Sequence, residues 1–251
     1  MHNNSLINSG FIRLVLFIFI VSVTAILLNT CSQSDDIQRW NKKYEYIQDI
    51  KPIVFHYDHG VLGGSYTEGI ETVEMRFDDV CAYLGHVCLC GAGGYRIAAL
   101  VIDSLYRDYG IPERGEFVLI SSRDHTISDV IAYCFGLTRR QKKVKSSYFI
   151  DDTIETPRRE YHYFIGSKET NRAFHVIYKK HRSIGHAAMD SLWKIEQQYE
   201  INPESVSESD MEKYSKAIEW TVRDVITGKR DSDLFEIKRV SYKETFSKFS
   251  M

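Results

Sequence analysis

An excess of charge of either sign is missing from this 251-residue chain, in which 32 lysines and arginines face 34 acidic residues, giving a net charge of −2. A protein without a basic field does not attract a phosphate backbone, so nucleic acid is not an expected partner. One basic run, residues 139–145, is short and isolated, and a solvated loop is its better interpretation. Repeats and low-complexity segments are also missing, and 43% hydrophobic residues is ordinary for a globular protein.

Two common functional signatures are missing as well. The glycine run at residues 91–94 lacks the G-x-G-x-x-G spacing and follows no apolar strand, which argues against a dinucleotide-binding loop. No G-x-S-x-G sequence is present, so a serine hydrolase built on a nucleophile elbow is not expected either.

One long apolar run is present, at residues 14–28, directly after Arg13. Its length suits the hydrophobic region of a signal peptide and is short for a stable membrane span. Cys31, with Leu28 three residues earlier, resembles the cleavage box of a bacterial lipoprotein. The sequence therefore predicts export to the bacterial cell envelope and membrane anchoring through a lipid on Cys31; an uncleaved signal anchor is the alternative.

Cysteines are few, and four remain if Cys31 is acylated. An even number in an oxidising compartment is compatible with two disulfides. Cys88 and Cys90 are too close for an unstrained bridge to each other, which favours one shared site. Cys81 and Cys134 have apolar sequence neighbours and are expected in the core, and a bridge between them stays open.

The most informative segment is residues 85–96, which places His86, Cys88 and Cys90 within five residues. In an extended chain these three side chains point the same way. Thiolate and imidazole are preferred ligands of zinc, and the glycines that follow let the backbone approach a bound ion. We therefore predict a divalent metal, of the zinc type, on these three residues. The alternative is a glycine-rich loop with small buried cysteines.

The flanking segments place further polar groups near this site. Apolar periodicity predicts helices over residues 72–84 and 93–109, and the positive end of the second would lower thiol pKa values. A buried strand at 116–122 leads into a helix in which His125 and Asp129 are four residues apart and share a face. We expect these two as further ligands or as acid–base groups.

The pattern of elements predicts an α+β fold, with a mixed or antiparallel sheet packed against helices. Aromatic alternation between residues 146 and 180 indicates strands, and helices are expected over about 184–199 and from Ser209 to Gly228. The predicted parts are a signal peptide or anchor over 1–31, a linker over 32–50, a metal-binding domain over 51–182 and a helical extension over 183–251.

Two blocks of the chain resemble the FmdE family of formylmethanofuran dehydrogenase subunits, over about residues 70–180. The first block resembles the family's motif at Gly85, His86, Cys88 and Gly91, and at the Gly94-Tyr95-Arg96 that comes after them. The second runs from Asp124 to Asp129 and on to Gly136-Leu137-Thr138. Leu89 replaces the family's usual proline, and Thr126 stands where the family has a cysteine.

The resemblance implies that His86 and Cys88 are primary metal ligands, that Cys90 replaces the ligand lost at Thr126, and that the protein is a homodimer. Exposed aromatic residues of the C-terminal helices are also expected to favour a dimer, namely Trp193, Tyr199, Tyr214 and Trp220. Arg96 is expected to supply positive charge for an anionic group.

Three functions are compatible with these residues. The leading one is a metal-dependent protein of the cell envelope, which would be an enzyme if three protein ligands leave a coordination position open for a small-molecule ligand. The second is a surface carrier that captures a metal ion or a metal-bearing cofactor. The third is thiol redox chemistry at Cys88 and Cys90 without a metal.

Overall fold

The computed structural model describes residues 40–66, 69–137 and 147–247. The predicted lipidation site Cys31 and the apolar run at 14–28 lie outside these residues. Residues 43–251 form one compact unit, which contains both β-sheets. Within the described residues, no helix combines the length and the apolar character that crossing a bilayer requires.

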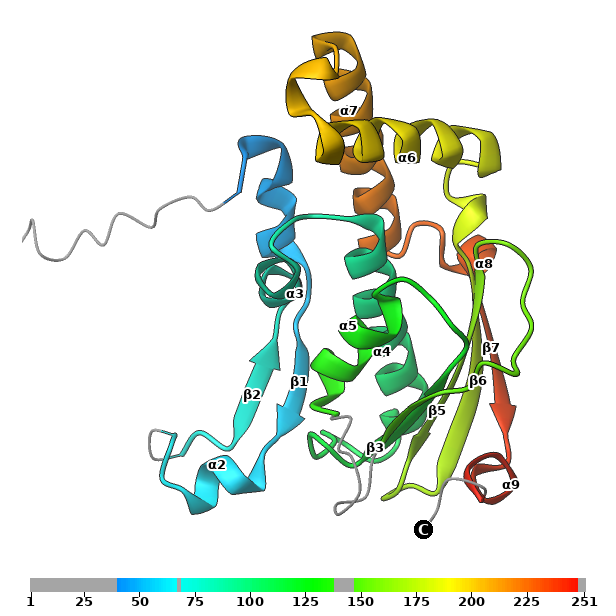
Figure 1. The fold of residues 1–251 in the computed structure, drawn as a ribbon. Helices are drawn as coiled ribbons and strands as arrows, with labels where there is room; N and C mark the ends of the chain where they lie inside the picture. The colour runs from blue at the N-terminus through cyan, green and yellow to red at the C-terminus, as the bar shows by residue number, and fades with distance from the viewer. Residues whose placement is uncertain (1–39, 67–68, 138–146, 248–251) are drawn as a thin grey trace, which may run out of the picture. The chain divides into compact units, whose positions relative to one another are not determined.

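The centre of this unit is a five-stranded mixed sheet with the order β4-β3-β5-β6-β7 (Figure 1). Its strands are β3 (Phe117–Ser121), β4 (Tyr148–Ile150), β5 (Glu160–Ser167), β6 (Arg172–Lys179) and β7 (Phe235–Val240). β3 and β4 are parallel, and the other pairs are antiparallel. With the helices packed on this sheet, the predicted α+β class is confirmed.

A smaller sheet pairs β1 (Ile53–His56) with β2 (Thr72–Met75), with α2 (Asp58–Leu62) between them in the chain. The helix predicted over residues 72–84 is therefore wrong in its first half. β2 pairs with β1 from Thr72 opposite His56 to Met75 opposite Ile53, and only then does α3 (Phe77–Leu84) begin. The Asp79 carboxylate accepts a hydrogen bond from the Arg76 backbone N–H at 2.8 Å and caps that helix.

The central helix α4 (Leu89–Tyr106) lies between the sheet and α5 (Ile127–Phe135). Its early glycines are packing residues. A Cβ on Gly93 would lie 2.5 Å from the Tyr178 ring of β6, and one on Gly94 would lie 2.7 Å from the Val130 side chain of α5. Glycine lets α4 approach both neighbours more closely than any other residue would.

The opposite face of the sheet has its own small core. Val118 and Ile120 of β3 and Ala173 of β6 pack there against Phe246 of α9 (Tyr242–Phe246). Because side chains alternate along a strand, β3 supplies both faces, with Phe117 and Leu119 fully buried on its other face.

The C-terminal third contains helices where the sequence predicts them, and also a strand that it does not. After η2 (Lys180–Arg182) come α6 (His186–Ile201), η3 (Pro203–Ser205), α7 (Glu208–Ile226) and α8 (Asp231–Leu234). β7 then pairs with β6 and completes the sheet. The predicted boundary at residue 182 and the purely helical extension are thus corrected, because the C-terminal segment supplies an edge strand to the same sheet.

Part of the predicted linker is also folded. Residues Lys42–Asp49 form the 3-10 helix η1, and the Arg223 guanidinium of α7 donates to the Lys43 carbonyl at 3.2 Å. Arg223 also lies over the Tyr46 ring, 4.6 Å from its centroid. This cation–π contact holds the η1 segment against α7.

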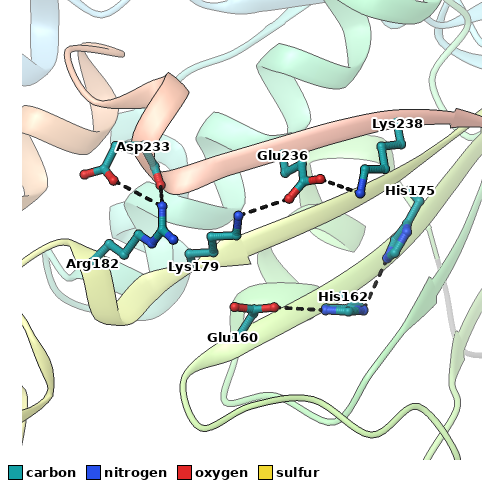
Figure 2. A network of polar contacts seen from close by, with 8 residues as sticks. All are labelled: Glu160, His162, His175, Lys179, Arg182, Asp233, Glu236 and Lys238. Atoms are coloured by element: carbon teal, nitrogen blue, oxygen red, sulfur yellow. Dashed lines mark hydrogen bonds and ion pairs between the residues drawn. The ribbon is translucent and has the colours of Figure 1, made fainter.

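Polar side chains connect the ends and edges of β5, β6 and β7 (Figure 2). Glu236 of β7 lies between Lys179 and Lys238, with 3.0 Å from the Lys179 Nζ to its Oε2. On the neighbouring strands the His175 Nε2 lies 3.3 Å from the His162 Nδ1. The His175 ring also stacks on Phe164 with centroids 4.3 Å apart.

This position of His175 predicts an acid-sensitive fold. Burial, then the neighbouring His162 and Lys238, lower the pKa of His175 to about 4, whereas an unfolded histidine has a pKa of about 6.5. Between these values the unfolded chain binds more protons, so stability falls as the pH falls from about 6.5 to 4. We expect a loss on the order of 1 kcal/mol, because the ring is only half-buried. Denaturant midpoints at pH 7 and 5 should differ less in His175→Gln than in the unaltered protein, and an equal difference would contradict the assignment.

Candidate thiol site

The two motif cysteines lie at the N-terminus of α4, which begins four residues earlier than predicted. Cys88 is the N-cap, with φ −148° and ψ 164°, and its Sγ accepts from the Gly91 backbone N–H at 3.3 Å. Cys90 lies in the first helical turn. Residues 86–90 are therefore not one extended strand, and the predicted alternation of His86, Cys88 and Cys90 is wrong.

Cys90 is surrounded by hydrogen-bond donors. The Lys180 Nζ lies 3.0 Å from the Cys90 Sγ, and the Cys88 thiol and the His125 ring also donate to this sulfur. The Cys88 hydrogen bond is the largest influence, and with the positive charge of Lys180 it holds the pKa of Cys90 well below its usual range despite burial. These contacts favour the thiolate form of Cys90.

The partners of Cys90 are shifted in the opposite direction. Donation to Cys90, burial and the neighbouring negative charge raise the pKa of Cys88 well above its usual value. Burial opposes the charged form of Lys180, but the charge of Cys90 outweighs it and the pKa is raised. The hydrogen bond to Cys90 likewise raises the pKa of His125. The hydrogen bond between the two thiols therefore favours the proton on Cys88 and the negative charge on Cys90.

A cavity of about 520 Å³ opens onto this pair. Its walls come from the start of α4, the His125 loop, η2, α6 and α7, and apolar side chains such as Met189, Leu192 and Ile218 dominate them. Arg158 and Arg159 at its edge both bind the Asp190 carboxylate, at 2.5 and 2.6 Å. A small and mostly apolar molecule fits this space better than a highly charged one.

His86 lines the same cavity, but its exposed ring is directed to the local backbone, with its Nδ1 3.0 Å from the Leu84 carbonyl oxygen. In the described part of the chain no three histidine, cysteine or acidic side chains are placed to hold a metal ion. The Lys180 ammonium, moreover, already neutralises Cys90 at 3.0 Å. The residues as arranged do not fit the predicted zinc centre, which stays a prediction of the sequence.

Asp129 does not lie beside His125 as predicted. α5 begins at Ile127, so His125 precedes the helix, and Thr126 between them has a left-handed backbone with φ 73°. Asp129 instead accepts from the Tyr148 hydroxyl at 3.0 Å and lines a separate cavity. The i, i+4 spacing would bring the two side chains together only if both residues were helical.

Asp124, which the sequence pattern does not single out as a site residue, holds the His125 loop in place. Its carboxylate accepts from the Ser128 N–H and hydroxyl, both at 2.8 Å, and from the Tyr163 hydroxyl at 2.7 Å. A polar residue just before a helix, with serine four residues later, is the local signal that indicates such a cap.

Arg96 lies away from the thiol pair. Six residues make about one and two-thirds helical turns, so Arg96 and Cys90 are on different sides of α4. The Arg96 guanidinium binds the Asp231 carboxylate of α8 through two contacts, one of them 2.9 Å between Nε and Oδ1. Its role is to tie α4 to the segment before β7, and its predicted role at the site is not supported.

The remaining cysteines and aromatic residues divide between core and surface. Cys81 and Cys134 are buried and free, as expected of core residues, and burial raises the pKa of each to about 12. Three of the four aromatic residues of the C-terminal helices are exposed, namely Trp193, Tyr199 and Trp220. Tyr214 lines the thiol cavity instead. The homodimer stays a prediction.

No protein-family model, no curated protein and no solved structure matches the chain. The resemblance to the FmdE family therefore stays a prediction from the sequence, together with the metal chemistry and the homodimer that it implies.

Proposed function

We propose that the protein is a thiol-dependent enzyme whose nucleophile is the Cys90 thiolate. The observation that carries the proposal is the contact of 3.0 Å between the Lys180 Nζ and the Cys90 Sγ, at the wall of a cavity of about 520 Å³. A thiolate stabilised by a cation and by hydrogen bonds is the reactive form of cysteine, whereas a structural cysteine is protonated and inert.

The surrounding groups supply the other parts of covalent catalysis. Cys90 attacks an electrophilic carbon or sulfur of the substrate, and Lys180 stabilises the thiolate before the attack. His125, whose pKa is raised by its hydrogen bond to Cys90, donates a proton to the leaving group. The apolar walls favour a small, largely uncharged substrate. Thiol redox chemistry would use the same sulfur.

The pH dependence of alkylation tests this proposal. An ordinary cysteine reacts about tenfold more slowly with iodoacetamide for each pH unit below its pKa. Cys90 should lose much less than this between pH 8 and 6, because the Cys88 hydrogen bond and the Lys180 charge hold its pKa well below the usual range. Mass spectrometry of the digested protein identifies the labelled residue, and Cys90→Ser should abolish the fast reaction.

Two results would contradict the proposal. One is alkylation of Cys90 with the steep pH dependence of an ordinary thiol. The other is stoichiometric zinc in protein purified without chelators, together with Cys90 that reacts only after the zinc is removed, which would favour the metal centre instead.

We further propose that the protein acts in the cell envelope, anchored through Cys31. The support is the apolar run at residues 14–28 and Leu28 three residues before the cysteine. Cys31→Ser should release the protein from membranes or leave an unprocessed precursor, since acyl chains would be its main anchor. Cys81→Ser is the matched control and should change neither the mass of the processed protein nor its location. Unchanged mass and membrane attachment of Cys31→Ser would show that the apolar segment itself is the anchor.

A further inference from the structure

The contact between Cys90 and Lys180 joins a nucleophilic sulfur to a primary amine, and this pairing has a second chemical consequence. We propose that mild oxidation links the two residues through a covalent bond between the Cys90 Sγ and the Lys180 Nζ, which reversibly switches off the thiol site. The inference depends on the proposed function in one respect, that Cys90 is the reactive sulfur of the site.

The geometry favours this bond before any reaction occurs. The two atoms lie 3.0 Å apart, so they need to approach by little more than an ångström to bond. Both residues line the cavity, where a small oxidant such as hydrogen peroxide can reach them. The two residues are 90 positions apart in the chain, so the bond would fix α4 to η2, directly after β6.

The chemistry takes two steps. In the first, the Cys90 thiolate attacks one oxygen of hydrogen peroxide and the O–O bond breaks; sulfur is oxidised to sulfenic acid, and the other oxygen leaves as hydroxide, which a proton converts to water. In the second, the neutral amine of Lys180 attacks the sulfenic sulfur. The S–N bond forms, the S–O bond breaks, and the hydroxide takes the amine proton and leaves as water. The linked pair has lost two hydrogen atoms relative to thiol and amine.

The amine needed for the second step is formed beside the sulfur that it attacks. The Lys180 Nζ lies 3.0 Å from the Cys90 Sγ. The hydroxide released in the first step takes a proton from this ammonium group, which gives water and the neutral amine.

The competing partner for the oxidised sulfur is Cys88. It donates a hydrogen bond to Cys90, but only one residue separates the two. A disulfide across that separation closes a small ring and would have to distort the cap and first turn of α4. The lysine can reach the sulfur without moving the backbone of the helix.

The test is oxidation of the full chain with about one equivalent of hydrogen peroxide, followed by alkylation, tryptic digestion and mass spectrometry. We expect a joined peptide pair containing Cys90 and Lys180, lighter by two hydrogen atoms and uncleaved after Lys180. Alkylation of Cys90 should fall by at least about tenfold on oxidation and should return with dithiothreitol, because a thiol reduces the S–N bond.

Two variants make the experiment specific. Lys180→Arg keeps the positive charge without a nucleophilic amine, so a second equivalent of hydrogen peroxide should oxidise its Cys90 sulfenic acid to sulfinic acid, which dithiothreitol does not reduce. Cys88→Ser should still give the joined peptide pair. A Cys88–Cys90 disulfide as the main product would overturn the inference, as would full recovery in Lys180→Arg or a Cys90–Lys180 link that retains an oxygen atom. If reduced Cys90 alkylates rapidly but no link forms, this inference alone fails; if it does not alkylate rapidly, the proposed function fails as well.

Discussion

Replacing Lys180 with methionine should slow alkylation of Cys90 at pH 7 by at least about tenfold, because a buried thiolate loses its nearest positive charge. The Lys180 Nζ is 3.0 Å from the Cys90 Sγ, and its charge is among the main influences that lower the pKa of that thiol. Burial raises the pKa of Cys90, and without Lys180 only the remaining hydrogen bonds would counteract it. At a pH below the pKa of Cys90, each unit by which that pKa rises lowers the thiolate fraction tenfold.

The full pH–rate profile separates this effect from a loss of structure. Methionine has a similar length and no charge, so at high pH, where Cys90 is ionised in both proteins, the two rates should converge. Lys180→Arg is the matched control, because it retains the charge and should keep most of the reactivity at pH 7. An unchanged profile in Lys180→Met would mean that Cys88 and the helix N-terminus set the ionisation of Cys90 without the lysine.

The part of the site that lies in one short segment could be predicted from the sequence. His86, Cys88 and Cys90 are close together in the chain, and all three line the same cavity. Lys180 could not be found in this way, because it is 90 residues from Cys90 and comes close only when β6 packs beside α4. The sequence therefore favours a metal on the two sulfurs, whereas the folded chain places an ammonium ion there.

In the fold, too, elements that depend on local sequence could be predicted, and elements that depend on distant partners could not. Long periodic segments, such as those that form α4 and α7, could be recognised from apolar spacing. β2 and β7 could not, because strands of four and six residues are defined by partners elsewhere in the chain. Thr72–Met75 continues the apolar spacing of α3, and only its pairing with β1 makes it a strand.

Gly93→Val should destabilise the protein by about 3 kcal/mol, the upper end of the usual cost of overfilling a packed interior. A Cβ at this position would lie 2.5 Å from the Tyr178 ring, and Tyr178 is fully buried and stacked on Phe235. Gly93→Ala should cost about 1–2 kcal/mol even though alanine is the better helix former. Denaturant midpoints measure both changes.

The matched control is Ala99→Val in the same helix. The side chain of Ala99 borders a cavity, so this substitution should cost less than about 1 kcal/mol of stability.

The same contact determines how close the reactive groups are. Gly93 is three residues after Cys90 on α4, and Tyr178 is two residues before Lys180 at the end of β6. The approach of Gly93 to Tyr178 therefore sets the separation of the thiolate from its cation. A folded Gly93→Ala protein should move the two apart and raise the pKa of Cys90, so its alkylation at pH 7 should slow in the same direction as in Lys180→Met. If Gly93→Ala loses stability while Cys90 reacts at the original rate, helix packing and thiolate stabilisation are independent, and the short distance between Lys180 and Cys90 must be maintained by η2 alone.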